Sequence, residues 1–196
     1  RGVIAGTEAL PPVYAQRRTN RGFEGIATDG VRVYAFMQSP LDNPDTAGDA
    51  ASKLSRIVRI LAFDPATERT IGEYAYVIEG GGSDKIGDAA MIGPDRFLVI
   101  ERDDQLGPRA KQRIYAIDLA PATNLATLDA VIVGPGGTLE DMLPESLSSH
   151  GIVPVSKTLW ADLAALGFSS ISAKAEGLAV IDADRVAIVN DDDFGM

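Results

Sequence analysis

Short apolar segments separated by tight polar turns recur along the whole chain. The clearest case is 174–195, where an apolar stretch, 178–181, is followed by a turn, 182–184, and a second mainly apolar stretch, 185–189. Two such segments joined by so short a polar turn predict a β-hairpin. An acidic cluster, 190–193, follows the second predicted strand directly.

The same hairpin pattern occurs twice earlier, at 24–38 and 87–101, and the three copies align without a gap. Gly25, Asp88 and Gly177 fall at one position of this repeat. An internal repeat of this size constrains the whole architecture, because each copy forms the same local structure.

Each of the first two hairpins continues into two further predicted strands. The third strands are 56–63 and 112–119, and a turn containing proline ends each of them. The fourth strands are expected at 70–78 and 127–133. Hairpin, strand, turn and strand together predict a four-stranded antiparallel meander, which is the unit of a β-propeller blade.

We therefore expect an all-β chain forming one propeller-type domain over 1–196. The meander units lie at about 23–78, 86–133 and 152–195, with an irregular insertion at 134–151. Ring closure needs at least about four blades, so we expect a partial ring that belongs to a longer domain. A β-sandwich is the alternative fold.

The composition of the chain argues against several kinds of binding partner and several kinds of chemical site. The 196-residue chain is 45% hydrophobic, enough for one substantial core, and it has no cysteine for a disulfide or a thiolate site. Its net charge of −10, from 18 basic and 28 acidic residues, argues against nucleic acid or an anionic membrane surface as partner. No apolar run has the length of a transmembrane helix.

Carboxylates recur at the hairpin ends and are the main candidates for chemistry. In a propeller the repeat places Glu24, Asp88 and Glu176 around one axis, with the ends of the second strands on a shared face. Converging carboxylates repel one another unless a cation binds between them, and hard oxygen ligands favour calcium. The other reading is that each cluster is an ordinary solvated hairpin end.

Two further features bear on an anionic substrate. The cluster Arg17, Arg18 and Arg21 is either a solvated loop or a rim that contacts an anion, since arginine grips phosphate oxygens with a planar fork of donors. The single histidine, His150, is expected in a surface loop, and no GxSxG motif accompanies it, which argues against a serine esterase.

Several pieces of the chain, including the three hairpins, resemble the phytase-like family, which is described by the esterase-like activity of phytase. The matching pieces cover most of the chain, and Ala175 is the mild departure, since a larger apolar residue is expected there. The pieces are NRGFEGIATDGVRVYAFMQSPL (20–41), RILAFDPAT (59–67), EYAYVI with KIGDAAMIGPDRFLVIERDD (73–78 and 85–104), RIYAIDL (113–119) and KAEGLAVIDADRVAIVNDDDFG (174–195).

The resemblance implies an exported bacterial β-propeller, periplasmic or extracellular, that hydrolyses a small anionic substrate such as a phosphate ester with calcium. Bound calcium reverses the local negative charge and activates an attacking water. The candidate catalytic residues are Glu24, Glu101 and Glu176. The candidate substrate-binding residues are Arg102 and Arg21, and the candidate metal ligands are Asp103, Asn190, Asp191 and Asp193.

Two alternatives remain open from the sequence. One is a non-catalytic propeller, a binding or scaffold module with structural calcium. The other is a lactonase-like metal hydrolase, in which Glu24, Asp88 and Asn190 converge on a single ion.

Overall fold

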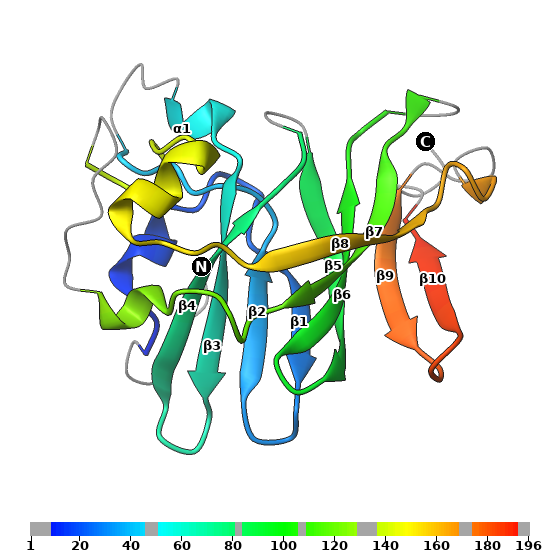
Figure 1. The fold of residues 1–196 in the computed structure, drawn as a ribbon, viewed down its shortest axis with the longest axis horizontal. Coiled ribbons are helices and arrows are strands. Elements are labelled where there is room, and N and C mark those ends of the chain that lie inside the picture. Colours follow the sequence, from blue (N-terminus) through cyan, green and yellow to red (C-terminus); the bar gives the residue numbers. More distant parts are fainter. Residues whose placement is uncertain are drawn as a thin grey trace.

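The structure is a computed structural model that describes residues 9–45, 51–80, 84–105, 109–128, 137–168 and 174–191. It is all-β with few helices, and its strands form two four-stranded antiparallel sheets and a two-stranded hairpin (Figure 1). The first sheet contains β1 (Phe23–Thr28), β2 (Val33–Met37), β3 (Ile57–Asp64) and β4 (Arg69–Val77). The second contains β5 (Lys85–Gly93), β6 (Arg96–Arg102), β7 (Gln112–Asp118) and β8 (Ser156–Asp162). The hairpin is β9 (Ala175–Val180) and β10 (Val186–Asn190).

The remaining elements are short helices: η1 (Pro12–Gln16), α1 (Ala51–Leu54), η3 (Leu125–Thr127) and η4 (Pro144–His150). Among the described residues, no helix is long and apolar enough to cross a membrane.

Aspartates form the predicted turns between strands. The Oδ1 atom of Asp29 accepts hydrogen bonds from the backbone N–H of Val31 (2.9 Å) and Arg32 (2.6 Å), and Gly30 takes a φ of +86°. These backbone hydrogen bonds lower the pKa of Asp29 to about 2. The turn after β3 follows the same rule, because Asp64 accepts from the N–H of Ala66 at 2.8 Å.

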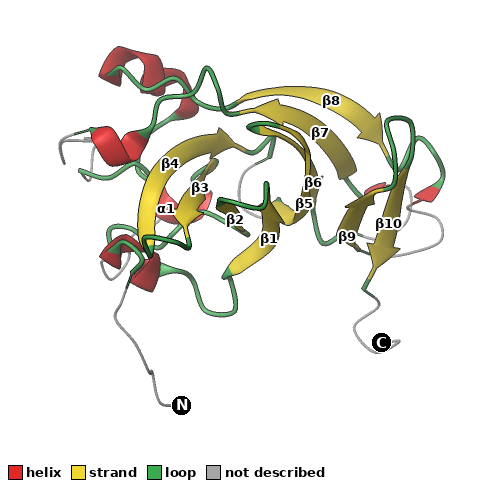
Figure 2. Ribbon diagram, turned by 90° about the horizontal axis from the view of Figure 1, so that it is seen from below, coloured by secondary structure: helices red, strands yellow, loops and turns green. Residues whose placement is uncertain are grey.

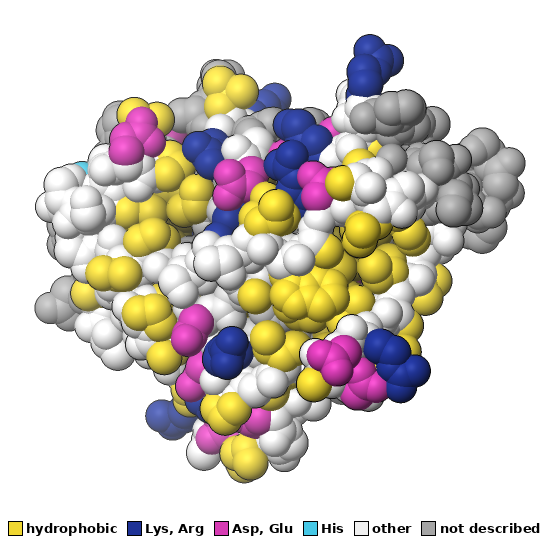
Figure 3. All heavy atoms as spheres, turned by 45° about the vertical axis from the view of Figure 1, so that its right-hand side comes forward, with side chains coloured by type: hydrophobic (Ala, Val, Ile, Leu, Met, Phe, Trp, Pro, Cys, Tyr) yellow, Lys and Arg dark blue, Asp and Glu magenta, His cyan; other side chains and the backbone are white. Residues whose placement is uncertain are grey.

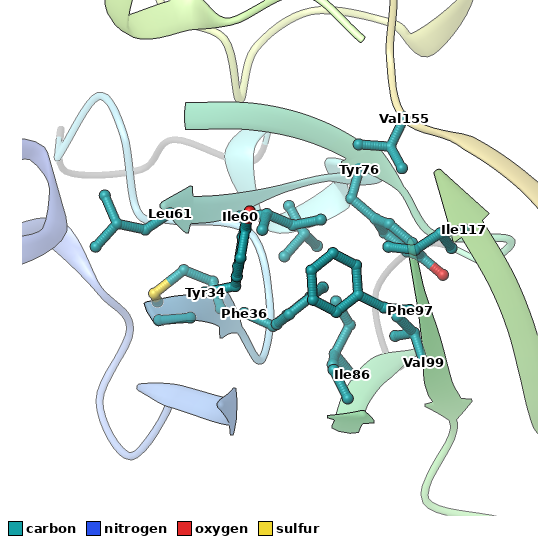
Figure 4. Packing of buried hydrophobic residues seen from close by; sticks show 14 of the residues in the cluster. Tyr34, Phe36, Ile60, Leu61, Tyr76, Ile86, Phe97, Val99, Ile117 and Val155 are labelled. Carbon is teal, nitrogen blue, oxygen red and sulfur yellow. The ribbon is translucent and has the colours of Figure 1, made fainter. Parts of the chain in front are cut away.

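Strands that are apolar on both faces, such as β2 and β3, are buried between the sheets. The main core lies between the first and second sheets (Figure 4). There the ring of Phe97 packs edge-on against Phe36 and Tyr34, with centroid distances of 5.4 and 4.9 Å. Burying these rings supplies both apolar area and the favourable edge-to-face geometry.

The fourth strand of the second sheet is β8, not the predicted stretch 127–133. In that stretch Thr127 ends η3, and 129–133 lie outside the described residues. The side chain of Asn124 accepts a hydrogen bond from the N–H of Ala126 at 3.0 Å, which starts a 3₁₀ turn where the apolar pattern predicted a strand. β8 then pairs with β7 after the insertion.

The insertion packs on the first sheet before β8 returns to the second. Leu125, Leu139, Met142, Leu147 and Ile152 form one buried cluster with Ile57 and Ala75 of the first sheet. The N–H of Val155 donates to the carbonyl of Ala75 at 2.8 Å. The segment between β7 and β8 therefore bridges the two sheets.

The first strands of the three units are neighbours in space. β1 contacts β5, and β5 contacts β9, while β4 and β8 lie toward the outside of the fan of sheets (Figure 2). Contact is close: a Cβ on Gly25 would lie 2.8 Å from the N of Ala89, and one on Gly87 would lie 2.6 Å from the carbonyl O of Ala175. Glycine at these positions lets the strand backbones approach.

Candidate functional site

A polar cavity of about 350 Å³ lies where the repeated units meet. Its wall comes from the segment before β1, the starts of β1, β5 and β9, the end of β6 and the residues that follow β2 and β10. The lining residues are Thr19, Asn20, Arg21, Glu24, Gln38, Lys85, Arg102, Lys174, Glu176 and Asp191. We call this the central cavity. In Figure 3, Lys and Arg side chains stand among Asp and Glu at the upper part of the face shown, with a hydrophobic patch below them.

The internal repeat explains why these residues meet. Glu24 and Glu176 occupy the same position of the repeat, and Lys85 and Lys174 share another, two residues before it. The N–H of Ile86 donates to the carbonyl of Gln38 at 2.9 Å, which joins the start of β5 to the end of the first hairpin. Equivalent residues of successive units are thus brought to one end of the fold.

Arg102 is the most buried cation in the wall, with 3% of its surface exposed. Its Nη1 donates to the carbonyl of Asp103 (3.3 Å) and to Oδ1 of Asp104 (3.0 Å), and its Nη2 donates to Glu176. Its Nε is buried and has no partner in the described part of the chain. A buried donor without a partner costs free energy.

Positive charge is concentrated around Lys85. Its side chain is 9% exposed, and its Nζ donates to Oδ1 of Asp104 at 2.6 Å. Burial lowers the pKa of Lys85, and the charges of Arg21 and Arg102 lower it further, while Asp104 acts in the opposite direction. With Lys174 the wall holds four cations and three carboxylates, in a chain whose net charge is −10.

Glu24 differs from the other carboxylates of the wall. Over the described ranges no hydrogen bond or ion pair involves its side chain, which is exposed to the cavity mouth. Glu176 is instead paired with Arg102. Asp191 is held near Lys174, whose carbonyl accepts its N–H at 3.0 Å. Glu24 is therefore the carboxylate best placed to accept a proton from a water in the cavity.

Two other predicted site residues lie behind the cavity wall. Glu101 is 4% exposed and accepts hydrogen bonds from the hydroxyl of Tyr76 (2.5 Å), the N–H of Glu79 (3.0 Å) and Nζ of Lys157. Its carboxylate thus ties β6 to the first sheet and to β8. Asp103 is 3% exposed, and its Oδ1 accepts from the N–H of Gln105 and Lys111 at 3.0 and 3.1 Å.

The remaining predicted residues are placed as follows. Asn190 ends β10 opposite Ala175. Asp193 lies outside the described residues. Asp88 accepts a hydrogen bond from the N–H of Leu178 at 2.7 Å, and so links β5 to β9. His150 is exposed at the end of η4, as predicted, and its Nδ1 lies 2.9 Å from the carbonyl O of Ser146.

Sequence reasoning missed Lys85 and Lys174 as functional candidates. The signal was present, because a lysine precedes the aligned part of the second and third hairpins at the same position.

The side chains of the described residues bear on whether the predicted calcium could bind in the central cavity. Within the described residues, no group of three or more His, Asp or Glu side chains is arranged to hold a metal ion. Four cations line the same wall, and they repel Ca²⁺. The described residues of the cavity therefore fit an anion better than a metal cation.

Comparison with known proteins agrees with the resemblance seen in the sequence. The phytase-like family, described as esterase-like activity of phytase, matches residues 1–194. Neither a curated protein nor a solved structure matches the chain. The family match covers nearly the whole sequence, from the first strands to the acidic cluster, and the chain belongs to the phytase-like family.

Proposed function

We propose that this chain hydrolyses small phosphate monoesters, with the phosphate bound in the central cavity. The observation that carries the proposal is the concentration of four cations, one with a buried unpartnered Nε, beside the free carboxylate of Glu24. Membership of a family described by an esterase-like activity of phytase supports the same class of reaction.

The cations and Glu24 have separate roles in this proposal. Arg21, Lys85, Arg102 and Lys174 bind the phosphate oxygens and balance the charge that develops in the transition state. Glu24 takes a proton from the attacking water, the water oxygen bonds to phosphorus, and the ester P–O bond breaks. The alcohol leaves with a proton from solvent. Glu176 and Asp104 position the guanidinium of Arg102 through their ion pairs.

We also propose that the two sheets and the hairpin are blades of a β-propeller whose inner strands are β1, β5 and β9. The repeated four-stranded antiparallel sheets and the contacts between successive first strands support this arrangement over a β-sandwich. Export to the periplasm or the cell exterior remains an expectation from the family resemblance.

The first prediction concerns Arg21, whose Nη1 donates to Oε1 of Gln38 at 3.2 Å. Arg21→Gln should raise KM for a phosphate monoester about 10- to 150-fold, because one charge-assisted hydrogen bond to phosphate contributes about 1.5–3 kcal/mol. Phosphate release by the purified chain measures this. Arg69→Gln, which removes an exposed charge at the start of β4, outside the cavity lining, should leave KM unchanged. Equal KM values for the unaltered chain, Arg21→Gln and Arg69→Gln would show that the phosphate does not bind in this cavity.

The second prediction concerns calcium, which we propose is bound by Asp191 together with Asp193, in the acidic cluster that follows β10. Calcium at 100-fold over its dissociation constant should stabilise the fold by about 2.7 kcal/mol. The melting temperature should then be about 5–11 °C higher with calcium than with EDTA. The Asp191→Asn, Asp193→Asn variant should lose this difference. Identical melting curves for the unaltered chain in calcium and in EDTA would show that these residues hold no calcium.

A further inference from the structure

A cavity of about 440 Å³ lies between the first sheet and the insertion, and we call it the insertion cavity. Residues of β3, β4, η1, η3 and the insertion line it, and Figure 1 shows the short helices beside β4. The described residues that line the insertion cavity and those that line the central cavity have no member in common. The reaction proposed above does not use the insertion cavity.

Three charged side chains form a buried group at this cavity, one positive and two negative. The side chains of Arg59, Glu73 and Glu140 are 8%, 11% and 0% exposed. Nε of Arg59 donates to Oε1 of Glu140 at 2.6 Å, and its Nη2 donates to Oε2 at 3.1 Å. Because this pair is bidentate, the guanidinium of Arg59 chiefly offsets the charge of Glu140.

The carboxylate of Glu73 lines the cavity and has weaker partners. Its Oε1 lies 3.7 Å from Nη1 of Arg59 and accepts a hydrogen bond from the hydroxyl of Tyr14 at 2.7 Å. Burial and the charge of Glu73 raise the pKa of Tyr14, so that this hydroxyl stays neutral. Among the described residues, Arg59 is the cation that pairs with the two glutamates, which leaves a net charge of −1. A buried charge is costly unless an opposite charge accompanies it.

The rest of the cavity wall is mainly apolar. Leu125 and Leu139 are 5% and 1% exposed, whereas Leu128 is 38% exposed, so that a ligand can contact it from solvent. Within the described part of the chain, no three His, Asp or Glu side chains are grouped to hold a metal ion. An ammonium group on an alkyl chain fits this wall better, because it brings a positive charge to Glu73 and apolar atoms to the leucines.

We propose that the insertion cavity binds a small alkylammonium ion, with its ammonium group at the carboxylate of Glu73 and its alkyl chain against Leu125 and Leu128. This site goes beyond the proposed function, because its ligand is a cation and not a phosphate ester. The bound ion contacts the first sheet and the segments that pack on it, so it stabilises the packing of the insertion on that sheet.

Titration calorimetry with n-butylammonium chloride tests the proposal on the unaltered chain, Glu73→Gln, Leu128→Ala and the control Glu145→Gln. Kd should rise about 10-fold in Glu73→Gln, which loses a charge-assisted contact, and about threefold in Leu128→Ala, which loses apolar contact. Glu145→Gln removes an exposed charge outside the cavity lining and should leave Kd within about twofold. Equal Kd values for the unaltered chain and Glu73→Gln would overturn the proposal.

Two further ligands test the separate parts of the site on the unaltered chain. Ammonium chloride lacks the alkyl chain and n-butanol lacks the charge, so each should bind at least about 10-fold more weakly than n-butylammonium. Binding of either compound as tight as that of n-butylammonium would contradict the assignment. If Glu73→Gln does not fold, as its melting curve would show, Leu128→Ala decides, and an unchanged Kd in that variant would also overturn the proposal.

Discussion

Glu24→Gln should lower kcat for phosphate release at least 100-fold while changing KM little. The carboxylate of Glu24 has no hydrogen bond or ion pair within the described ranges and stands in the wall of a cavity that holds four cations. The amide of glutamine keeps the size of the side chain but cannot accept a proton from water. General-base catalysis of this kind contributes roughly 10²–10⁴-fold.

The matched control is Glu145→Gln, which neutralises an exposed carboxylate in the first turn of η4, outside the cavity. It should keep full activity. Unchanged melting temperatures would show that both variants fold normally. A Glu24→Gln protein with at least half of the original kcat would exclude Glu24 as the base.

Glu140→Ala should cost about 3–5 kcal/mol of stability, because it leaves the charge of Arg59 buried without its main partner. Oε1 of Glu140 lies 2.6 Å from Nε of Arg59, and the two side chains are 0% and 8% exposed. Asn43 donates to the same carboxylate at 2.7 Å. Glu73 is the other carboxylate near Arg59, at 3.7 Å. The melting temperature should fall by about 6–20 °C for a chain of this length.

Urea unfolding would measure the loss, and two variants serve as controls. Arg59→Met combined with Glu140→Leu removes both charges and should cost much less than Glu140→Ala alone. Asp182→Asn breaks an ion pair with Arg185 that is exposed at the hairpin turn, and it should change stability by less than about 1 kcal/mol. If the free energy of unfolding of Glu140→Ala equals that of Asp182→Asn, the buried ion pair between Arg59 and Glu140 does not stabilise the packing of the insertion on the first sheet.

Local signals in the sequence were sufficient to predict the hairpins and the third strands of the two sheets. Asp29, Asp64 and Asp182 each accept backbone N–H groups at a turn, which is the chemistry that predicts turns from sequence. β8 lies within the third unit predicted at 152–195, but its pairing with β7 of the second sheet was missed because the two strands are distant in the chain. The apolar residues of β8 also do not mark a buried face, since Leu159 and Trp160 are 55% and 45% exposed.

The candidate site could be predicted only in part, because burial at a strand end depends on the neighbouring sheet. Glu101 and Arg102 are adjacent in sequence, yet Arg102 lines the cavity and Glu101 is bonded behind it to Tyr76. Glu24, Glu176 and Asp191 were predicted and do line the cavity with Arg21 and Arg102. Lys85 and Lys174 were missed because the repeat was aligned on its carboxylates.

The path of the chain between β7 and β8 has a consequence for how the molecule acquires its structure. β8 reaches the second sheet only after the insertion has docked on the first, and Nζ of Lys157 in β8 donates back to the carbonyl of Val77 in β4 at 2.8 Å. Pairing of strands so far apart in sequence is slow, because loop-closure entropy is lost before the contacts form. We therefore expect the first sheet to act as a template for completing the second. We expect the two sheets to fold and unfold as one cooperative unit, so that exchanging a single sheet between relatives would disrupt both.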